Sequence, residues 1–405
     1  MVRQITYVLV IIALSMVLVG GGENFAAAGQ PKPLTAQVER GLDWLLKHQQ
    51  ENGGCAQGEE SEAMGNALDN LKDKPNIADT CMALLALVRS GSTPKDGPYA
   101  ANIRKGLNFI CREIEASDAQ SLYITSIRGT RIQMKIGTYI DTFLAANVLT
   151  DVRDQMPDEQ SHKRILAALD KVMDKIESNQ RADGTWDNQG WATDLAQNMA
   201  TKSLNKAAQL GYAVDEKVRE RAETYARQQF DRKKGGFTVS ERSAGVELYS
   251  SGAAVSSMQQ SATTNEVKKQ EVQRKLKDAK TDQERQEAED TLSRFEQTER
   301  DLSDARKAVV GRLQDKQFIA GFGSNGGEEF LSYLNIGESL FAAGGQDWEK
   351  WDQEITANLN RIQNNDGSWT GHHCITGRTF CTSAALLVMM IDRAPEPISS
   401  KIKQQ

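Results

Sequence analysis

Apolar residues recur at steps of three and four along most of this chain, which is the period of amphipathic helices. Such segments occupy residues 38–50, 165–180, 218–229 and 351–363. Each is followed by a glycine-bearing loop and then by a more uniformly apolar helix rich in Ala and Leu, as at residues 79–91, 194–211 and 379–391. Weaker copies of this two-helix unit lie between these segments, and patterns typical of β-strands are scarce. The pattern predicts an all-α protein in which amphipathic outer helices alternate with apolar inner helices, in about six hairpins.

A short motif marks the loops between outer and inner helices. Residues 180–186 and 363–369 both read Gln-x-x-x-Gly-x-Trp. Degenerate copies lie at 49–55, where Cys55 replaces the Trp, and at 229–237, which has two extra residues and ends in Phe237. We expect the Gly to adopt a left-handed turn that ends the outer helix, the Gln to satisfy backbone groups, and the aromatic ring to pack on the next unit.

One segment departs from this alternation. Residues 263–317 contain no Pro, no Gly before Gly311, a dense mixture of both charges and a thin apolar seam. This composition predicts an inserted antiparallel helical hairpin that protrudes from the body, with a turn near residues 280–282. It could be a partner-docking arm, a structural lid or a solvated, partly disordered helix.

The first 28 residues are typical of a secretory signal peptide. Arg3 precedes an apolar run at residues 5–20, and Ala26–Ala28 offers a cleavage site. We therefore expect export to the periplasm or the extracellular space and no membrane span after cleavage; the alternative is an uncleaved membrane anchor. The expected organisation is a signal peptide (1–28), the first part of the helical body (29–262), the inserted hairpin (263–317) and the last part of the body (318–405).

Composition and charge narrow the choice of partners. The 405 residues carry a net charge of −6, so the chain lacks the basic surface that nucleic acids require, and we expect none as a partner. No P-loop and no Gly-x-Ser-x-Gly elbow is present. An unknown protein or an apolar small-molecule ligand remains as the expected partner.

The Gln-x-x-x-Gly-x-Trp units resemble the repeats of squalene and oxidosqualene cyclases, and the alternation of helices is similar to the β subunits of protein prenyltransferases. The resemblance covers nearly all of the chain outside the signal peptide and the inserted hairpin. It implies a single α/α toroid, a double ring of helices whose inner ring surrounds a central cavity. The chain has no adjacent Asp-Asp pair, so the acid motif of the class II cyclases is absent.

The resemblance to prenyltransferases also implies a candidate zinc site. Those enzymes hold zinc with an Asp-x-Cys pair that opens an inner helix and with a His from another repeat. Asp79 and Cys81 open the first inner helix here, and His372 and His373 lie just before the last one. A closed ring would make these hairpins neighbours, and Asp, Cys and His ligands suit tetrahedral zinc. Alternatively, Asp79 is a helix N-cap, as its repeat partner Asp141 suggests.

The five cysteines leave a second possibility open, because disulfides are permitted outside the cytoplasm. Cys81 with Cys381, or Cys55 with Cys374, could form a disulfide across the seam of the ring. Cys111 is the fifth cysteine, and an odd number leaves at least one thiol without a disulfide partner in the chain.

Three functions remain open at this point, and the sequence favours the first of them. This is an exported binding or scaffold module that docks through the hairpin. The second is a zinc-dependent enzyme that resembles prenyltransferase β subunits. The third is a carbohydrate-active α/α toroid with paired carboxylates, for which the sequence singles out no pair; Asp194 and Glu338 would face the cavity if their helices are inner ones.

Overall fold

The computed structural model describes residues 31–64, 69–187 and 189–394. The predicted signal peptide lies outside these residues. The described part of the chain is all-α apart from two two-stranded antiparallel hairpins, β1 (Cys55–Ala56) with β2 (Pro75–Asn76) and β3 (Phe230–Asp231) with β4 (Gly236–Phe237). No helix among these residues is both long enough and apolar enough to cross a bilayer.

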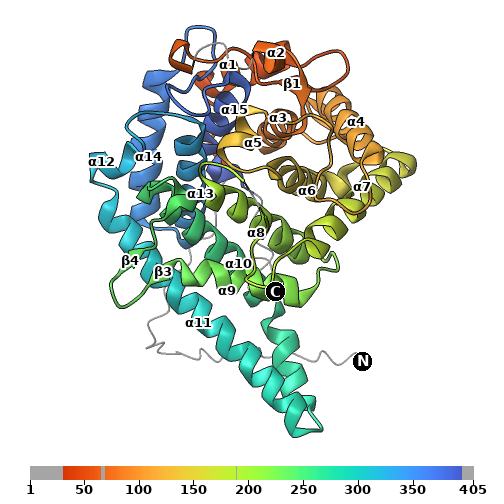
Figure 1. The fold of residues 1–405 in the computed structure, drawn as a ribbon, viewed down its shortest axis with the longest axis vertical. Helices are drawn as coiled ribbons and strands as arrows, with labels where there is room; N and C mark the ends of the chain where they lie inside the picture. The colour runs from red at the N-terminus through yellow and green to blue at the C-terminus, as the bar shows by residue number, and fades with distance from the viewer. Residues whose placement is uncertain (1–30, 65–68, 188, 395–405) are drawn as a thin grey trace, which may run out of the picture.

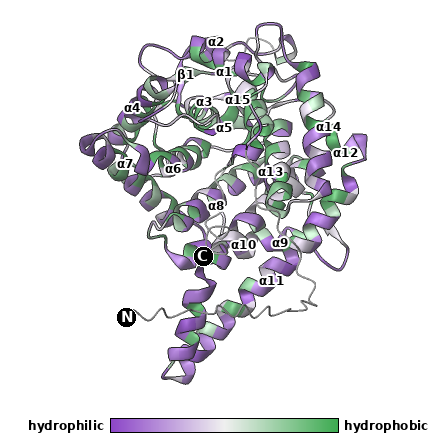
Figure 2. Cartoon of the chain, turned by 180° about the vertical axis from the view of Figure 1, so that it is seen from behind, coloured by the Kyte–Doolittle hydropathy of each residue, from purple (hydrophilic) through white to green (hydrophobic). Residues whose placement is uncertain are grey.

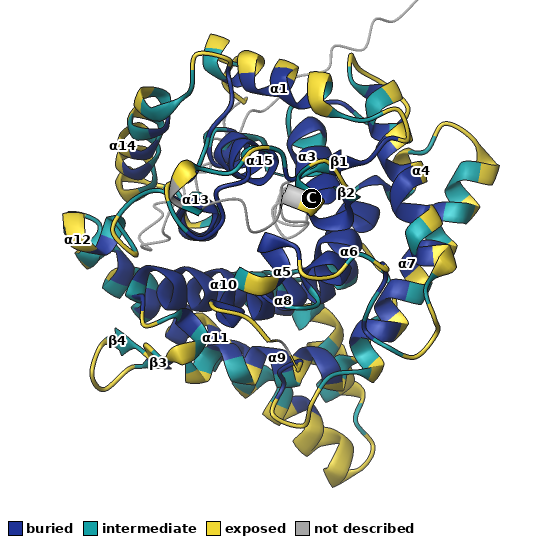
Figure 3. Cartoon of the chain, turned by 45° about the horizontal axis from the view of Figure 1, so that its top comes forward, coloured by how far each residue is buried: buried dark blue, intermediate teal, exposed yellow. Residues whose placement is uncertain are grey.

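Six inner helices form a closed ring (Figure 1). In ring order they are α3 (Ile77–Arg89), α6 (Ile140–Val152), α8 (Thr193–Gln209), α10 (Glu247–Asp278), α13 (Gly327–Ala343) and α15 (Arg378–Met389). Each packs on the next, and α15 packs back on α3. Their side chains are buried on nearly every face, as the dark blue helices of Figure 3 show. The predicted α/α toroid is therefore confirmed.

Six outer helices surround this ring and alternate with the inner ones along the chain. They are α1 (Ala36–His48), α4 (Ala100–Ala116), α7 (Glu159–Ser178), α9 (Glu216–Gln228), α11 (Asp282–Arg312) and α14 (Gln346–Ile362). The short helices α2 (Asp69–Lys72), α5 (Arg131–Lys135) and α12 (Lys316–Ile319) lie in the connections. The outer helices bury one apolar stripe and turn their charged side chains outward, so both colours alternate along α7 and α14 in Figure 2. This amphipathic stripe is the signal that the sequence carried.

The glutamine of the repeated motif joins each hairpin to the next outer helix. In three copies its side-chain amide donates to the carbonyl of the motif glycine and also to a carbonyl in the following outer helix. The pairs are Gln49 to Gly53 and Asn102, Gln180 to Gly184 and Val218, and Gln363 to Gly367 and Gln37. The third of these joins α14 to α1, so the same contact closes the ring.

The motif glycines allow a close backbone approach. Gly53, Gly184 and Gly367 have φ of +89°, +85° and +94°. A Cβ on them would lie 2.1, 2.2 and 2.6 Å from a backbone carbonyl oxygen in that same neighbouring outer helix. Only glycine fits both the conformation and the contact.

The motif tryptophans are buried at the same junctions between hairpins. Trp186 and Trp369 are fully buried, and each indole N–H donates to a carbonyl of the preceding outer helix, at 2.7 Å for Ile176 and 2.9 Å for Leu359. The degenerate copy at 229–237 lacks the glutamine link to the next outer helix, since the Gln229 side-chain amide donates to the carbonyl of Tyr225 in its own helix.

The predicted helical hairpin is present, but it is not an insertion. Its two helices are α10, which is the fourth inner helix, and α11, which is the fifth outer helix. Both are longer than their counterparts, and their distal parts, residues 269–293, protrude as an arm below the ring in Figure 1. The turn lies at residues 279–281, where sequence analysis placed it, and a capping box at Thr281 begins α11. Residues at both ends of the predicted segment, such as Thr264 and Val309, belong to the packed ring.

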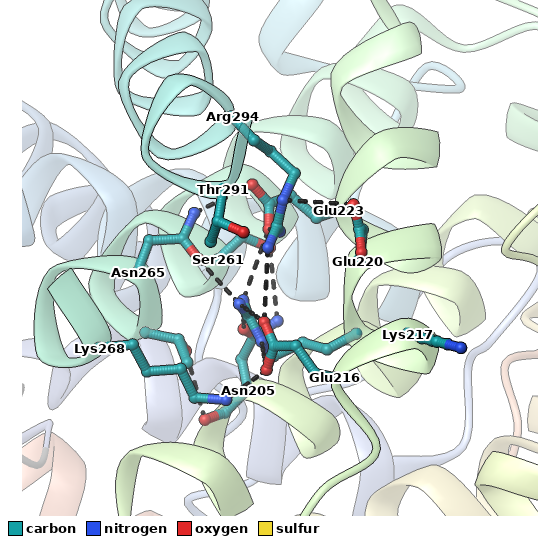
Figure 4. A network of polar contacts seen from close by, with 12 residues as sticks. Asn205, Glu216, Lys217, Glu220, Glu223, Ser261, Asn265, Lys268, Thr291 and Arg294 are labelled. Atoms are coloured by element: carbon teal, nitrogen blue, oxygen red, sulfur yellow. Dashed lines mark hydrogen bonds and ion pairs between the residues drawn. The ribbon is translucent and has the colours of Figure 1, made fainter. Parts of the chain in front are cut away.

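A buried polar network anchors the base of the arm (Figure 4). Arg219 of α9 is fully buried and donates to Asn265 of α10 at 2.9 Å. Glu223 of α9 accepts from Asn265 at 2.9 Å and from Arg294 of α11 at 2.5 Å. The network thus ties three helices together where the arm leaves the ring, which satisfies charges that would be costly to bury alone.

Candidate functional site

All six inner helices begin at the same end of the ring, because each follows a loop from the end of an outer helix. We call this end the mouth: the first turns of the inner helices together with the loops that lead into them. Five of the six carry acidic side chains in the first turn, namely Asp79, Asp141, Asp194, Glu247 and the pair Glu328–Glu329. Helix N-termini favour negative charge, so the mouth can hold several carboxylates at low energetic cost.

Glu328 and Glu329 form the most unusual part of the mouth. They are consecutive residues in the first turn of α13, and both are completely buried. Glu328 accepts the backbone N–H of Ile375 at 3.2 Å. Glu329 accepts the hydroxyl of Tyr249 and the backbone N–H of Phe322, the latter at 3.0 Å. Each carboxyl keeps one buried oxygen, Glu328 Oε1 and Glu329 Oε2, without a hydrogen bond from the residues that the structure describes.

Burial determines the protonation of this pair. Burial, reinforced by the neighbouring Glu329, raises the pKa of Glu328 to about 8. Burial also raises the pKa of Glu329, although the Tyr249 hydroxyl and the Phe322 N–H stabilise its ionised form. At neutral pH we therefore take Glu328 as a neutral carboxylic acid, with the negative charge on Glu329, which has more donors.

Two loops cover the carboxyls. His373, from the loop before α15, lies with Nε2 3.7 Å from Glu329 Oε2 and 2.7 Å from the carbonyl oxygen of Ser324. Because a carbonyl only accepts, Nε2 carries a proton. Gly321 and Gly326 of the loop before α13 pack against Glu329 so closely that a Cβ would lie within 2.9 Å of it.

An apolar surface lies directly over this cover. Met134, Trp191 and Phe322 are three of the five exposed large apolar side chains among the described residues. The Trp191 and Phe322 rings meet edge to face at 6.0 Å, and Phe322 lies 5.4 Å from the His373 ring. The ammonium of Lys135 sits over Trp191 at 4.7 Å. A continuous aromatic path therefore leads from solvent to the buried carboxyls.

The structure brings no three of the sequence-predicted zinc ligands together into one metal-binding group. Asp79 lies at the seam of α3 and α15, where it bonds to Asn76 at 2.8 Å. It is not the N-cap that sequence analysis offered as its alternative role: Asn76 is the cap, and Asp79 follows three residues later. Asp141 accepts the N–H of Ala78 at 3.0 Å and so caps the neighbouring helix. Burial raises the pKa of Asp79 to about 7.

Cys81 is fully buried, and burial raises the pKa of its thiol well above the usual value. A zinc ligand must be a thiolate, so this environment opposes metal binding. Nor do the described residues bring three or more His, Cys, Asp or Glu side chains into a group that could hold a metal ion. His372 is an exposed residue of the rim, while His373 turns toward Glu329. Zinc binding by Asp79, Cys81, His372 and His373 stays a prediction.

None of the considered disulfides is formed in the structure. All five cysteines are free thiols and all are buried. The other two acidic residues named above are both engaged: Asp194 pairs with Arg242 at 3.2 Å at the mouth, and Glu338 pairs with Arg89 at 2.9 Å at the opposite end of the ring.

Sequence analysis missed the Glu328–Glu329 pair. A signal was available, because two consecutive acidic residues open an otherwise apolar segment at 327–343. An inner helix of that kind buries its first turn, and buried consecutive carboxyls are rare outside functional sites.

Comparisons with known proteins support the fold and leave the family open. No protein-family profile and no curated protein sequence matches the chain. Two solved structures are similar over nearly their whole length. One is an inactive variant of an alpha-1,6-mannanase from Salegentibacter sp. in complex with alpha-1,6-mannotriose, with a TM-score of 0.52, 8% identity and coverage of 88% of this chain and 98% of that chain. The other is an alpha-amylase from Clostridium perfringens, with a TM-score of 0.51, 9% identity and coverage of 89% and 99%. At this identity the likeness shows the α/α toroid alone.

Proposed function

We propose that the protein is a carbohydrate-active α/α toroid that binds and cleaves an α-linked glycan at its mouth. The observation that carries the proposal is the buried Glu328–Glu329 pair beneath the exposed rings of Trp191 and Phe322. Glycoside hydrolysis requires two carboxyl groups in different protonation states, and saccharide sites combine aromatic surfaces with a few convergent polar groups.

The two carboxyls take different parts in this proposal. Glu328, with a pKa of about 8, keeps its proton at neutral pH and donates it to the leaving glycosidic oxygen. Glu329 stays ionised through the Tyr249 hydroxyl and the Phe322 N–H, and stabilises positive charge on the sugar ring or activates a water. The free oxygens Glu328 Oε1 and Glu329 Oε2 are the atoms available for these steps.

Substrate access requires the covering loop to move. Both carboxyls are completely buried, and residues 321–326 lie over Glu329. Phe322 belongs to this loop and also contacts Trp191. In the proposal, a sugar ring that stacks on Trp191 displaces Phe322. Because the backbone N–H of Phe322 donates to Glu329, the displacement of Phe322 uncovers this carboxylate.

The similar structures support the choice of substrate class. Both are enzymes of α-linked glycans, and the mannanase variant is described as inactive through replacement of two consecutive aspartates. Glu328 and Glu329 are likewise consecutive acidic residues. Neither of the two structures is a terpene cyclase or a prenyltransferase, so the prenyl-transfer alternative has no support from them.

The test begins with α-1,6-mannan and soluble α-glucans, measuring release of reducing ends and binding of the same polymers. Glu328→Gln should lower turnover by about 100-fold or more while binding persists, because a neutral amide keeps the shape but cannot donate a proton. Trp191→Ala should weaken binding. The matched control is Glu354→Gln, an exposed position of α14, which should change neither quantity. Wild-type protein that neither binds nor cleaves any α-glycan would disprove the proposal.

A second candidate is a scaffold that captures a partner protein through the arm, and the protrusion of residues 269–293 beyond the ring favours it. Deleting one heptad from each helix of the arm, residues 270–276 and 285–291, should then abolish capture of the partner and leave glycan cleavage unchanged. Full retention of capture would exclude the arm as the interface.

A further inference from the structure

Five charged side chains meet at the end of the ring opposite the mouth, near the C-terminal ends of the inner helices. Glu338 of α13 pairs with Arg89 of α3 at 2.9 Å and also with Lys202 of α8. One turn further along α8, Lys206 pairs with Asp151 of α6 at 2.5 Å. We call these five residues the inner charge cluster. Neither α3 nor α8 is adjacent to α13 in the ring, so Glu338 and its two partners reach across its centre.

The cluster is unbalanced in charge and largely buried. It contains three cations and only two carboxylates, and its side chains are between 10% and 14% exposed. Lys202 and Arg89 hold the pKa of Glu338 at about 2, against the effect of burial. Burial lowers the pKa of Lys206; Asp151 opposes this effect, whereas repulsion from Lys202 and Arg89 adds to it. An uncompensated charge in such surroundings costs several kcal/mol, so the excess cation calls for a negative partner.

Unused hydrogen-bond donors point to the same place. Arg89 has a side chain that is nine-tenths buried, and its Nη1 has no partner among the described residues although its Nη2 bonds to Glu338. Asn335 lies one turn before Glu338 on α13, is completely buried, and likewise leaves its side-chain amide without a described partner. Buried donors are almost always satisfied in proteins.

We propose that the inner charge cluster binds one small monovalent anion, of the size and chemistry of chloride, held by Arg89, Lys202 and the amide of Asn335. The anion balances the charge of the third cation and accepts hydrogen bonds from Arg89 Nη1 and the Asn335 side-chain amide. The anion thus neutralises the excess positive charge at the end of the ring opposite the mouth. This site is separate from the mouth, since Glu338 lies ten residues beyond Glu328 on α13, about 15 Å along the helix axis. The inference is independent of the proposed glycan chemistry.

The experiment measures the melting temperature of the full chain as sodium chloride replaces sodium gluconate at constant ionic strength. A site that fills over this range should raise Tm by about 2 to 5 °C with saturation. Acetate and phosphate series at the same ionic strength define the selectivity. A wild-type Tm that is the same in every salt would overturn the proposal, and would mean that the carbonyl ends of the helices alone compensate the third cation.

Two variants separate an anion site from a structural ion cluster. Lys202→Met leaves Arg89 and Glu338 as a balanced pair and should abolish the chloride dependence. Glu338→Gln increases the positive excess, so it should lower Tm in gluconate yet tighten the apparent chloride affinity by about 10-fold. Lys163→Met, on a 74% exposed side chain of α7, is the matched control and should keep the wild-type response. If both cluster variants lose stability equally in every salt, the cluster is only structural.

Discussion

The motif glycine at position 184 offers a direct test of how the ring is joined. In Gly184→Ala the new Cβ would lie 2.2 Å from the carbonyl oxygen of Arg221, whereas real Cβ contacts essentially never fall below 3.0 Å. The loop and α9 must therefore separate by about 0.8 Å or distort. Gly211 supplies the matched control, because it has almost the same φ, +80° against +85°, and nothing within 4 Å of its Cβ position.

The expected magnitudes follow from these contacts. Both substitutions place alanine in the left-handed region, which costs about 1 kcal/mol. In Gly184→Ala the overlap adds about 1–3 kcal/mol of overpacking strain. Separation of the loop from α9 also weakens the two hydrogen bonds that Gln180 donates to Gly184 and Val218, worth about 1 kcal/mol each. The total is about 4–6 kcal/mol for Gly184→Ala if both hydrogen bonds are lost, and about 1 kcal/mol for Gly211→Ala.

Urea denaturation of both variants and the wild type measures the difference. The midpoint should fall much further for Gly184→Ala, with an unchanged slope if the native and denatured states keep their compactness. Equal losses in the two variants would refute the reasoning, because the effect would then come from backbone conformation alone and the close approach to Arg221 would be energetically irrelevant.

Three further outcomes are expected. The pKa of Glu328 is raised from 4.5 to about 8 by folding, so its contribution to stability is complete below pH 4.5 and is lost as the pH rises through 8. Glu328→Gln should remove that part of the slope, up to about 5 kcal/mol, in urea titrations across this window. Arg219→Met removes the buried donor of the Asn205 and Asn265 side-chain oxygens and one of the two cations beside Glu223, and should cost about 3–5 kcal/mol, against no measurable loss for the half-exposed Arg300→Met. Deleting residues 270–276 and 285–291 should leave the Tm within about 2 °C of wild type, since the polar network at the base of the arm is retained; a large fall would show that the arm stabilises the ring.

Most of the fold could be predicted from the periodicity of apolar residues in the helices. The amphipathic outer segments, the apolar inner segments and the motif at 180–186 and 363–369 are local signals, and a local signal survives in any sequence that must bury one stripe of a helix. The hairpin at 263–317 was misjudged as an insertion because charge density reports solvent exposure and says nothing about connectivity. Its exposed arm has the composition of an appendage, yet both helices continue into the ring.

The candidate site was harder to predict, because its residues come together only in three dimensions. Tyr249, Phe322 and His373 lie far apart along the chain and meet around Glu329 because α10, α13 and α15 are consecutive in the ring. Zinc binding by Asp79, Cys81, His372 and His373 stays a prediction, because such a site also depends on side chains from different helices, and the described residues hold no group of three or more of the usual ligands. Consecutive residues gave the one local clue, at Glu328 and Glu329.

The way the ring closes also makes its starting point arbitrary. Gln363 joins the last outer helix to the first with the same contact that joins the others, and the backbone N–H of Lys32 donates to Asp392 at 2.8 Å. A chain in which these two neighbours are linked and the exposed loop at residues 210–215 is opened would keep all three glutamine links between hairpins and outer helices. Circular permutation should therefore preserve the toroid, and the order in which its hairpins are synthesised becomes a free variable for folding studies.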